Sequence, residues 1–403
     1  MGIVGRLIDR PQAAITAQQE AMIREIYGGG QTYAGVPMST DQAMRLVTVH
    51  TCVKILSETV KQLPCHLMAR DGDSKRKARE HYIYELIHSR PNSWMTAPDF
   101  WGMAEAQLAL RGNFYAYKTY GTDGRLRELI PLPINAVERV EQKPDYSIAY
   151  TLKRPDGETV EVDQSRIFHL IGLTLNGYIG VSPIEYARET MGLGVAGERF
   201  IAKYFGSGMH PGAIIKHPLA LSAPAHKNLR ENLKEKYQGL GKAHEFMLLD
   251  EGMDVTFPSI KLVDQQFLEQ MKLTESQICG LFRVPLMLIQ STTNTTTYAS
   301  AEQFMLSFVV HSLMPILVSF EHAISRDLLA ADERADYYAK FSVDGLLRGD
   351  IKTRMEAYGI AIDKEIMNPN EARDLEDLNP YPGGDEYRTR TSTVRKEGGG
   401  NES

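Results

Sequence analysis

Apolar residues recur at three- and four-residue spacing in several separate stretches of the chain, and each stretch predicts an amphipathic helix. Between residues 46 and 63 the repeat comprises Leu46, Val49, Val53, Leu56, Val60 and Leu63. Pro64 ends this pattern, because proline cannot continue a helix. Thr96 followed by Pro98 and Asp99 is typical of a helix start. Helices are expected at 46–63, 82–88, 97–111, 184–205, 264–283 and 300–330.

The apolar pattern changes to a period of two between Asn113 and Gly172, which predicts strands. The strand-like runs are NFYAYKTY, LRELIPL, SIAYTLK, TVEV and RIFHLIG, and turn sequences such as GTDG and RPDG separate them. A further strand is expected in AKFSVDGLL, residues 339–347. Residues 212–260 are interpreted as a small insert of strands around one helix, 224–238. The fold class expected from this order is α+β.

Composition is ordinary for a globular protein of 403 residues, with 43% hydrophobic positions and room for two or three substructures. The most apolar window, Phe304–Phe320, is interrupted by polar residues and Pro315, so no membrane span is expected. The N-terminal sequence has no long apolar stretch and no clear cleavage site, which disfavours secretion. The odd number of cysteines fits a reducing compartment; they are Cys52, Cys65 and Cys279.

Charge argues against a tight, general grip on nucleic acid. The formal net charge is −6, whereas proteins that neutralise many phosphates normally carry a basic excess. Weak or sliding contact is compatible with this balance. The stretch VPLMLIQSTTNTTTYASA, residues 284–301, has no charged side chain, although 24% of the chain is charged. A neutral polar loop between two helices is a candidate surface for contact without tight binding.

No catalytic motif stands in the sequence. Gly239-Leu240-Gly241-Lys242 fails as a phosphate-binding loop, because Ala243 replaces the Ser or Thr that reaches magnesium and Lys236 replaces the first glycine. H-E-x-x-H, paired C-x-x-C and G-x-S-x-G are absent. His210 and His217 are interpreted as ordinary polar residues and not as zinc ligands. We therefore expect no enzyme activity, no cofactor and no metal.

One alternative is a helix-turn-helix within residues 273–297, which would make the protein a DNA-binding regulator. Arg283 stands where a turn glycine is usual. The segment that would be the recognition helix, residues 287–297, has no Arg or Lys to read guanine. A helix that simply ends at Pro285 is the better interpretation, and the regulator is kept as the alternative function.

Eight segments in collinear order carry a resemblance to a known family. They are VHTCVKILSETVKQLPCHL (49–67), ELIHSRPNSWMT (85–96), LALRGNFYA (108–116), LIPLPINAVE (129–138), IFHLIGLTLNGYIGVSPIEYAR (167–188), FRVPLMLI (282–289), SVDGLLRGDIKTRMEAY (342–358) and MNPNEARDLEDLNPYPGGDEY (367–387). Each segment alone is weak, and together they span most of the chain. The set resembles the phage portal proteins of the HK97 type.

The resemblance implies a division of the chain into named regions. These are an N-terminal arm (1–40), an α+β wing (41–183), stem helix 1 (184–209), a small α/β clip (210–260), stem helix 2 (261–284), a tunnel loop (285–299), a long kinked helix with a wing return strand (300–350), a short helical crown (351–387) and a tail without helical pattern (388–403). Pro315 is the expected site of the kink, because its ring clashes with the preceding turn.

The resemblance also implies a non-enzymatic function at one capsid vertex of the virion. About twelve copies would form a ring, assembled in the host cytoplasm, through which double-stranded DNA passes without sequence specificity during packaging and ejection. Partners would be the large terminase subunit, which is the ATPase, the head–tail adaptor and the major capsid protein. The long helix is apolar nearly all round, which predicts cover by a neighbouring subunit and hence an obligate oligomer.

Two groups of contact residues follow from this assignment. The tunnel loop would face DNA with Gln290, Ser291, Thr292, Thr293, Asn294, Thr295 and Thr296. The clip helix has a mixed-charge face that would bind terminase and later the adaptor through Lys227, Arg230, Glu231, Lys234 and Lys236. A flexible surface loop and a solvated helix face are the competing interpretations of these two groups.

Overall fold

The structure is a computed structural model, and it divides the chain into two compact units. It describes residues 32–72, 74–154, 157–206, 261–289, 298–343, 345–346, 351–376 and 378–387, with short pieces at 214–216, 224, 227–228, 231 and 254–256. The first unit comprises Met1–Thr295 and Ser307–Phe341, and the second comprises Thr296–Leu306 and Ser342–Ser403.

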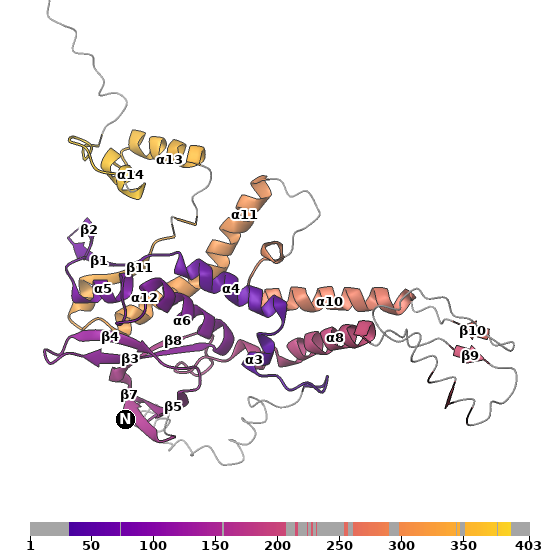
Figure 1. Cartoon of the computed structure of the whole chain (residues 1–403). Helices are drawn as coiled ribbons and strands as arrows, with labels where there is room; N and C mark the ends of the chain where they lie inside the picture. The colour runs from indigo at the N-terminus through magenta and orange to yellow at the C-terminus, as the bar shows by residue number, and fades with distance from the viewer. Residues whose placement is uncertain are drawn as a thin grey trace, which may run out of the picture. The chain divides into compact units, whose positions relative to one another are not determined.

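The helical layer of the first unit follows the apolar spacing of the sequence. Its helices are α3 (Thr40–Ala43), α4 (Val47–Lys61), α5 (Tyr82–His88) and α6 (Ala97–Arg111). The predicted repeat on α4 is confirmed, because Val49, Val53, Leu56 and Val60 are all buried. The Thr96 side chain accepts a hydrogen bond from the Asp99 N–H at the start of α6, as expected for a helix cap. Helices α4 and α6 pack against each other (Figure 1).

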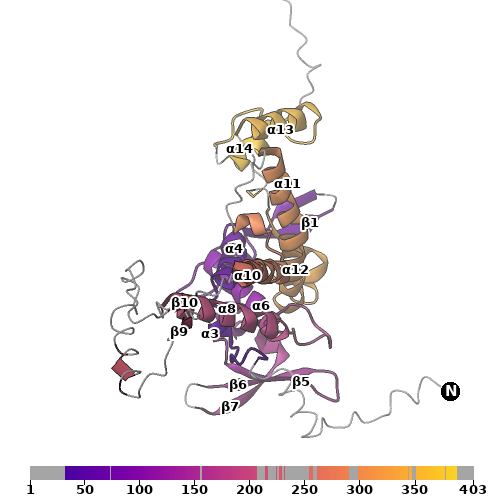
Figure 2. The same cartoon turned by 90° about the vertical axis from the view of Figure 1, so that its right-hand side faces the viewer.

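The described strands of the first unit form four antiparallel sheets, of which three have three strands each. These three are β11-β1-β2 (Tyr337–Phe341, Cys65–Asp71, Ser74–Lys77), β4-β3-β8 (Leu126–Pro131, Asn113–Tyr120, Ile167–Ile171) and β5-β6-β7 (Val137–Gln142, Ile148–Lys153, Thr159–Asp163). The third sheet forms a layer of its own (Figure 2). The α+β class is confirmed. Strands β2 and β5 were not predicted, and the last strand ends at Phe341 and does not extend to residue 347.

An aromatic cluster forms the core between α6, the sheets and the later helix α12 (Met314–Asp327). The Trp101 ring is 1% exposed and lies edge-on to Phe168 and Phe341, with centroid distances of 6.2 and 5.5 Å. Its Nε1–H donates to the Ile87 carbonyl at 2.9 Å, so the polar end of the indole is satisfied. Phe320 packs against the same ring, at 5.8 Å. This cluster holds β11 and α12 to elements from the first half of the chain.

Two helices leave this core and run side by side. They are α8 (Arg188–Gly206) and α10 (Lys261–Leu281), preceded by the short α7 (Pro183–Tyr186) and accompanied by the antiparallel pair β9 (Ile214–Lys216) and β10 (Asp254–Thr256) (Figure 1). A single helix was predicted from residue 184. The structure has two helices instead, because α7 ends at its C-cap Ala187 and α8 begins at Arg188. The predicted helix 224–238 lies largely outside the described residues.

The chain is helical again from Tyr298 to Asp327, as α11 (Tyr298–Phe308), a π-helical segment (Val309–Leu313) and α12. A 25-residue stretch of it, Gln303–Asp327, is long and apolar enough to cross a membrane by length and composition. The helical stretch is therefore longer than the apolar window seen in the sequence, and the expectation that it does not span a membrane stays a prediction. A single such helix is also typical of a protein core, and α12 buries Leu317 and Phe320 in the aromatic cluster.

The second unit contains the helices α13 (Ile351–Asp363) and α14 (Pro369–Leu375). Glu376 accepts hydrogen bonds from Arg354, at 2.8 Å, and from the Tyr358 hydroxyl, at 3.0 Å. Asn368 and Glu371 form a reciprocal capping box at the start of α14. These contacts join the two helices, while the apolar side chains of Met355 and Ile360 are exposed.

Candidate functional site

The candidate site is the point where α10 ends and the predicted tunnel loop begins. The Val284 N–H donates to the Cys279 carbonyl at 3.0 Å, and the Arg283 N–H donates to the Gly280 carbonyl at 3.1 Å. This pair of bonds is the Schellman arrangement that closes many helix C-termini. Its left-handed position usually carries glycine, but here Arg283 occupies it with φ 54°. The sequence observation about Arg283 therefore has a structural cause: this residue turns the chain at the helix end.

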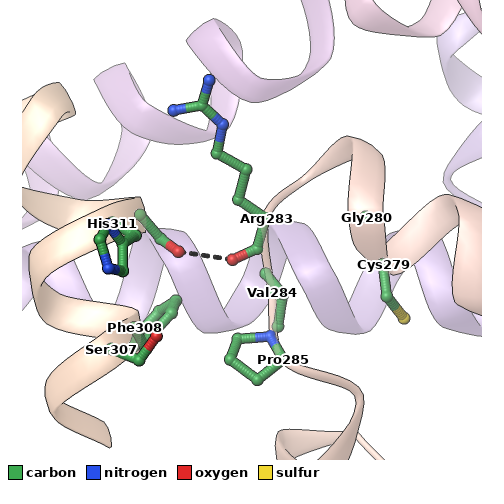
Figure 3. Close-up of a pocket in the computed structure, with 9 residues that line it drawn as sticks. Cys279, Gly280, Arg283, Val284, Pro285, Ser307, Phe308 and His311 are labelled. Carbon is green, nitrogen blue, oxygen red and sulfur yellow. Dashed lines mark hydrogen bonds between the residues drawn. The ribbon is translucent and has the colours of Figure 1, made fainter. Parts of the chain in front are cut away.

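The long helix fixes this turn from the other side. The Ser312 hydroxyl, which belongs to the π-helical segment, donates to the Arg283 carbonyl at 2.6 Å. The two elements border an open pocket of about 490 Å³, in which Phe308 and Pro285 lie on opposite sides while the Arg283 side chain extends away from both (Figure 3). The base of the loop is thus tied to one defined position on the long helix.

The π-helical segment ends just before Pro315, the residue expected to kink the long helix. Proline at position 315 has no N–H to donate to the His311 carbonyl, and its ring would collide with that carbonyl in a regular α-helix. One wider turn at Val309–Leu313 moves the carbonyl out of the way, and such segments are frequent at functional sites. Pro315 itself is exposed. The kink as such stays a prediction, although the helix is irregular at the expected place.

Close backbone approach holds α8 and α10 together near the wing. A Cβ at Gly194 on α8 would lie 3.5 Å from the Thr274 methyl group on α10, and the Thr274 hydroxyl donates to its own helix, at the Gln270 carbonyl. The Cys52 thiol on α4 and the Cys279 thiol on α10 form a hydrogen bond. Burial raises the pKa of the Cys52 thiol, so this pair is a neutral packing contact between the wing and α10.

A glycine junction connects strand β3 to the segment that leads into α7. The Gly180 N–H donates to Asn113 Oδ1 at 2.7 Å, and Asn113 Nδ2 donates to the Gly180 carbonyl at 2.7 Å. A Cβ on Gly180 would lie 1.9 Å from the Gly112 carbonyl oxygen, so only glycine fits there. Both segments carry the family resemblance, but the contact between them was not predicted. The signal available was the glycine density of LTLNGYIG, residues 173–180.

The titratable groups with large pKa shifts lie in the wing core. Burial raises the pKa of Glu105 to about 8, and this side chain is 1% exposed with no hydrogen-bond partner for its Oε2 atom. Burial, and secondarily the nearby Arg326, lowers the pKa of His169 to about 3. His169 contacts the Tyr150 hydroxyl at 3.1 Å and Asn113 Oδ1 at 3.0 Å. Both shifts follow from desolvation inside a packed core.

Most of the contact residues predicted from sequence lie outside the residues that the structure describes. The seven tunnel-loop residues, Gln290 to Thr296, lie outside the described residues, as do Arg230, Lys234 and Lys236 of the clip and His210 and His217. Lys227 and Glu231 are described, and both are helical and exposed. Within the described part of the chain, no group of three or more His, Cys, Asp or Glu residues is arranged to hold a metal ion.

The helix-turn-helix alternative gains no support from these elements. Residues 273–281, its proposed first helix, are the end of the 21-residue helix α10. A 3₁₀ turn, Leu286–Leu288, follows where the recognition helix would begin. Most of that proposed helix lies outside the described residues.

Comparison with solved structures identifies the fold as that of phage portal proteins. The structure is similar to the neck of a native gene transfer agent particle computed with C12 symmetry (TM-score 0.56, 19% identity, covering 94% of this chain and 99% of that one). It is also similar to the crystal structure of an HK97-family portal protein from Corynebacterium diphtheriae (TM-score 0.55, 16% identity, covering 77% and 96%). At these identities the likeness shows the fold.

The sequence establishes the family. The family model described as phage portal protein matches residues 47–377, and the chain belongs to this family. It is 29% identical over 374 residues to the probable portal protein of Streptomyces phage phiC31, covering 89% of this chain and 81% of that protein. It is 28% identical over 357 residues to the portal protein of Enterobacteria phage HK97, covering 86% and 82%. The expected family resemblance is confirmed, and the function is that of a phage portal protein.

Proposed function

We propose that about twelve copies of this chain form a closed ring at one capsid vertex of the virion, after assembly in the host cytoplasm. The observation that carries the proposal is the family match over residues 47–377. The exposure of apolar side chains on the long helix supports it: Val310 is 47% exposed and Val318 is 36% exposed, while Leu313 and Leu317 are buried. A helix with apolar residues on its exposed face needs a second surface to cover them, and a neighbouring subunit supplies it.

In this ring the residues Gln290 to Thr296 face the channel and contact double-stranded DNA as it enters during packaging and leaves during ejection. Their hydroxyl and amide groups make neutral hydrogen bonds to phosphates, each worth about 1 kcal/mol at most and readily exchanged with water. The anchored turn at Arg283, with its 2.6 Å bond from Ser312, gives the loop a fixed base on one side. Lysines at the same positions would form a salt-dependent grip and slow the movement of DNA.

The clip residues are proposed to bind the large terminase subunit, which supplies the ATPase activity, and afterwards the head–tail adaptor. Lys227 and Glu231 are exposed one helical turn apart, which supports a mixed-charge contact face. The protein itself is non-enzymatic and needs no cofactor in this proposal. The major capsid protein is the remaining partner, around the vertex.

The channel assignment is tested by changing loop charge at constant loop length. Replacing Thr292 and Thr295 with lysine is expected to leave ring assembly intact and to slow or arrest DNA packaging at low salt. The matched control replaces the same two residues with serine, which keeps neutral hydroxyls and is expected to package normally. Electron microscopy measures ring assembly, and DNase-protected DNA measures packaging. Normal packaging by the lysine variant at low salt contradicts the channel assignment.

The clip assignment has its own test. Reversing Arg230 and Lys234 to glutamate is expected to weaken terminase capture by assembled rings in a pull-down. The same reversal at two exposed lysines, Lys143 in the turn after β5 and Lys153 at the end of β6, is the control for net charge. Equal capture by the clip variant and the unmodified ring removes the clip assignment and leaves the channel assignment standing.

A further inference from the structure

The sheet β11-β1-β2 has one buried face and one partly exposed face, which Tyr84 and His88 of α5 cover at His66. The exposed part of this second face is rich in cations. Cys65, Leu67 and Ala69 alternate along β1 on the buried side. The alternate residues of β1, which are His66, Met68 and Arg70, point to the second face. Their register partners on β11 and β2 point to that same face. The residues of this face include four cations, Arg70 and Lys340 on the strands β1 and β11 and Lys75 and Lys77 on β2, which together we name the basic face.

The strand register brings these cations close to one another. Arg70 lies directly opposite Lys75, and Met68 lies directly opposite Lys77. Opposite side chains in an antiparallel pair have Cβ atoms about 5 Å apart, and like charges at that spacing destabilise the sheet. Lys75 and Lys77, two residues apart on one strand, are about 7 Å apart. A chain with net charge −6 therefore concentrates positive charge on one small flat surface, at a cost to its own stability.

The positive potential of the basic face reaches the groups around it. Lys340 pairs with Glu321, at 3.5 Å. The Arg70 guanidinium donates to the Ala335 carbonyl at 2.7 Å and lies 4.9 Å from the centre of the Tyr338 ring, and neither contact neutralises its charge. The potential extends to the start of β1: burial first, and then Lys77, His88 and Arg79, lower the pKa of His66 to about 4.

The chemistry of the surface selects the partner. Protein interfaces bind mainly through exposed apolar and aromatic anchors surrounded by a polar rim. The apolar residues of this face, Met68 and Tyr338, are only partly exposed, and the Arg70 guanidinium covers the Tyr338 ring. What the face presents to solvent is a regular set of cations without an apolar anchor. Nucleic acid phosphates, spaced regularly along a backbone and bound without sequence readout, match such a surface.

We propose that the basic face binds the phosphate backbone of double-stranded DNA outside the channel, as a second nucleic-acid contact of this protein. Lys75 and Lys77 project from β2, whose outer edge pairs with no other strand in the described structure, so a duplex can approach them without displacing any element. Arg70 and Lys340 extend the contact across the two inner strands. The contact is sequence-independent, and its affinity falls as the salt concentration rises.

Closed circular duplex DNA separates this contact from the channel, because a covalently closed circle cannot thread a closed ring. Assembled rings are mixed with labelled circular DNA, and binding is measured against salt concentration. The variant Lys75→Gln/Lys77→Gln is expected to bind at least about tenfold more weakly at about 0.1 M salt, with the salt slope reduced by about 0.9 for each phosphate that the protein no longer neutralises. The charge-preserving variant Lys75→Arg/Lys77→Arg is expected to bind like the unmodified ring.

The matched control is Lys143→Gln/Lys153→Gln, which removes two exposed positive charges from the turn after β5 and the end of β6 and is expected to leave binding unchanged. Unchanged binding by the Lys75/Lys77 glutamine variant overturns the proposal, and so does equal weakening by the control. Binding of labelled poly-glutamate to the same rings is measured in parallel. If the Lys75→Gln/Lys77→Gln variant loses poly-glutamate binding and keeps DNA binding, the face binds an acidic protein and the proposal is overturned. None of these results bears on linear DNA inside the channel, so the two proposals fail separately.

Discussion

Glu105 gives the wing a stability that depends on pH in a calculable way. The side chain is 1% exposed, its Oε2 atom has no hydrogen-bond partner, and burial raises its pKa from 4.5 to about 8. When folding raises the pKa of a carboxyl group, that group stabilises the fold in full at pH values below its unfolded-state pKa. That contribution is lost as pH rises from 4.5 through 8. At about 1.36 kcal/mol for each pKa unit, the shift from 4.5 to about 8 changes the free energy of unfolding by up to about 5 kcal/mol.

Glu105→Gln keeps the size of the side chain and removes the titration. At pH 5 the two proteins are expected to have similar thermal stability, because the carboxyl is then close to neutral in the fold. At pH 8 the glutamine variant is expected to be the more stable by a few kcal/mol, since the unmodified protein must bury a charge or take up a proton.

The assay is thermal unfolding by scanning fluorimetry at fixed protein concentration from pH 5 to pH 8.5. The difference between the two melting temperatures isolates Glu105, because other groups such as His169 titrate in both proteins. The expected result is that the melting temperature of the glutamine variant exceeds that of the unmodified protein by an amount that grows steadily above pH 5. A glutamine variant less stable than the unmodified protein at pH 8 would refute the reasoning, since it would mean that the carboxylate is charged and stabilised in the fold.

Three further substitutions test the packing of the wing and the turn at the end of α10. Trp101→Ala is expected to cost about 3–5 kcal/mol by leaving a cavity among the aromatic rings, with loss of soluble rings as the readout and Trp101→Phe as the milder comparison. Gly180→Ala is expected to abolish ring formation, because its Cβ would lie 1.9 Å from the Gly112 carbonyl oxygen; normal rings by electron microscopy would contradict this. Arg283→Gly is expected to raise stability by up to about 1 kcal/mol in thermal unfolding, because glycine adopts the left-handed conformation without strain.

Local patterns were enough to predict most of the helices and strands. The repeat from Leu46 to Leu63 predicted α4, and the period-two runs after Asn113 predicted β3, β4, β6, β7 and β8. Strand β5 was missed because VERVEQ places charges at half of its positions and lies in an exposed sheet. The strand β2, SKRK, is exposed at every position, so no apolar alternation marks it.

Long-range pairing could not be predicted from such patterns. The contact of Asn113 with Gly180, the bond from Ser312 to Arg283 and the register of β11 on β1 join residues far apart in sequence. For the site, neutrality of residues 284–301 pointed to the loop, and Arg283 was noticed as an unusual turn residue before its φ angle gave the reason. The run SKRKAR, residues 74–79, is visible in the sequence as a basic stretch, but only the strand register adds Arg70 and Lys340 to it.

The pairing of β1 with β11 has a consequence for how the protein is made. Cys65 lies opposite Phe341, so the central sheet cannot be completed until the ribosome has synthesised nearly the whole chain, including α8, α10 and everything between them. Chains that terminate before Met314 lack β11 and α12, and with them Phe320 and Phe341 of the aromatic cluster. Such fragments cannot close the core that carries the subunit's outer surfaces. Selection of subunits thus begins during translation, because only chains synthesised through Phe341 can complete this core.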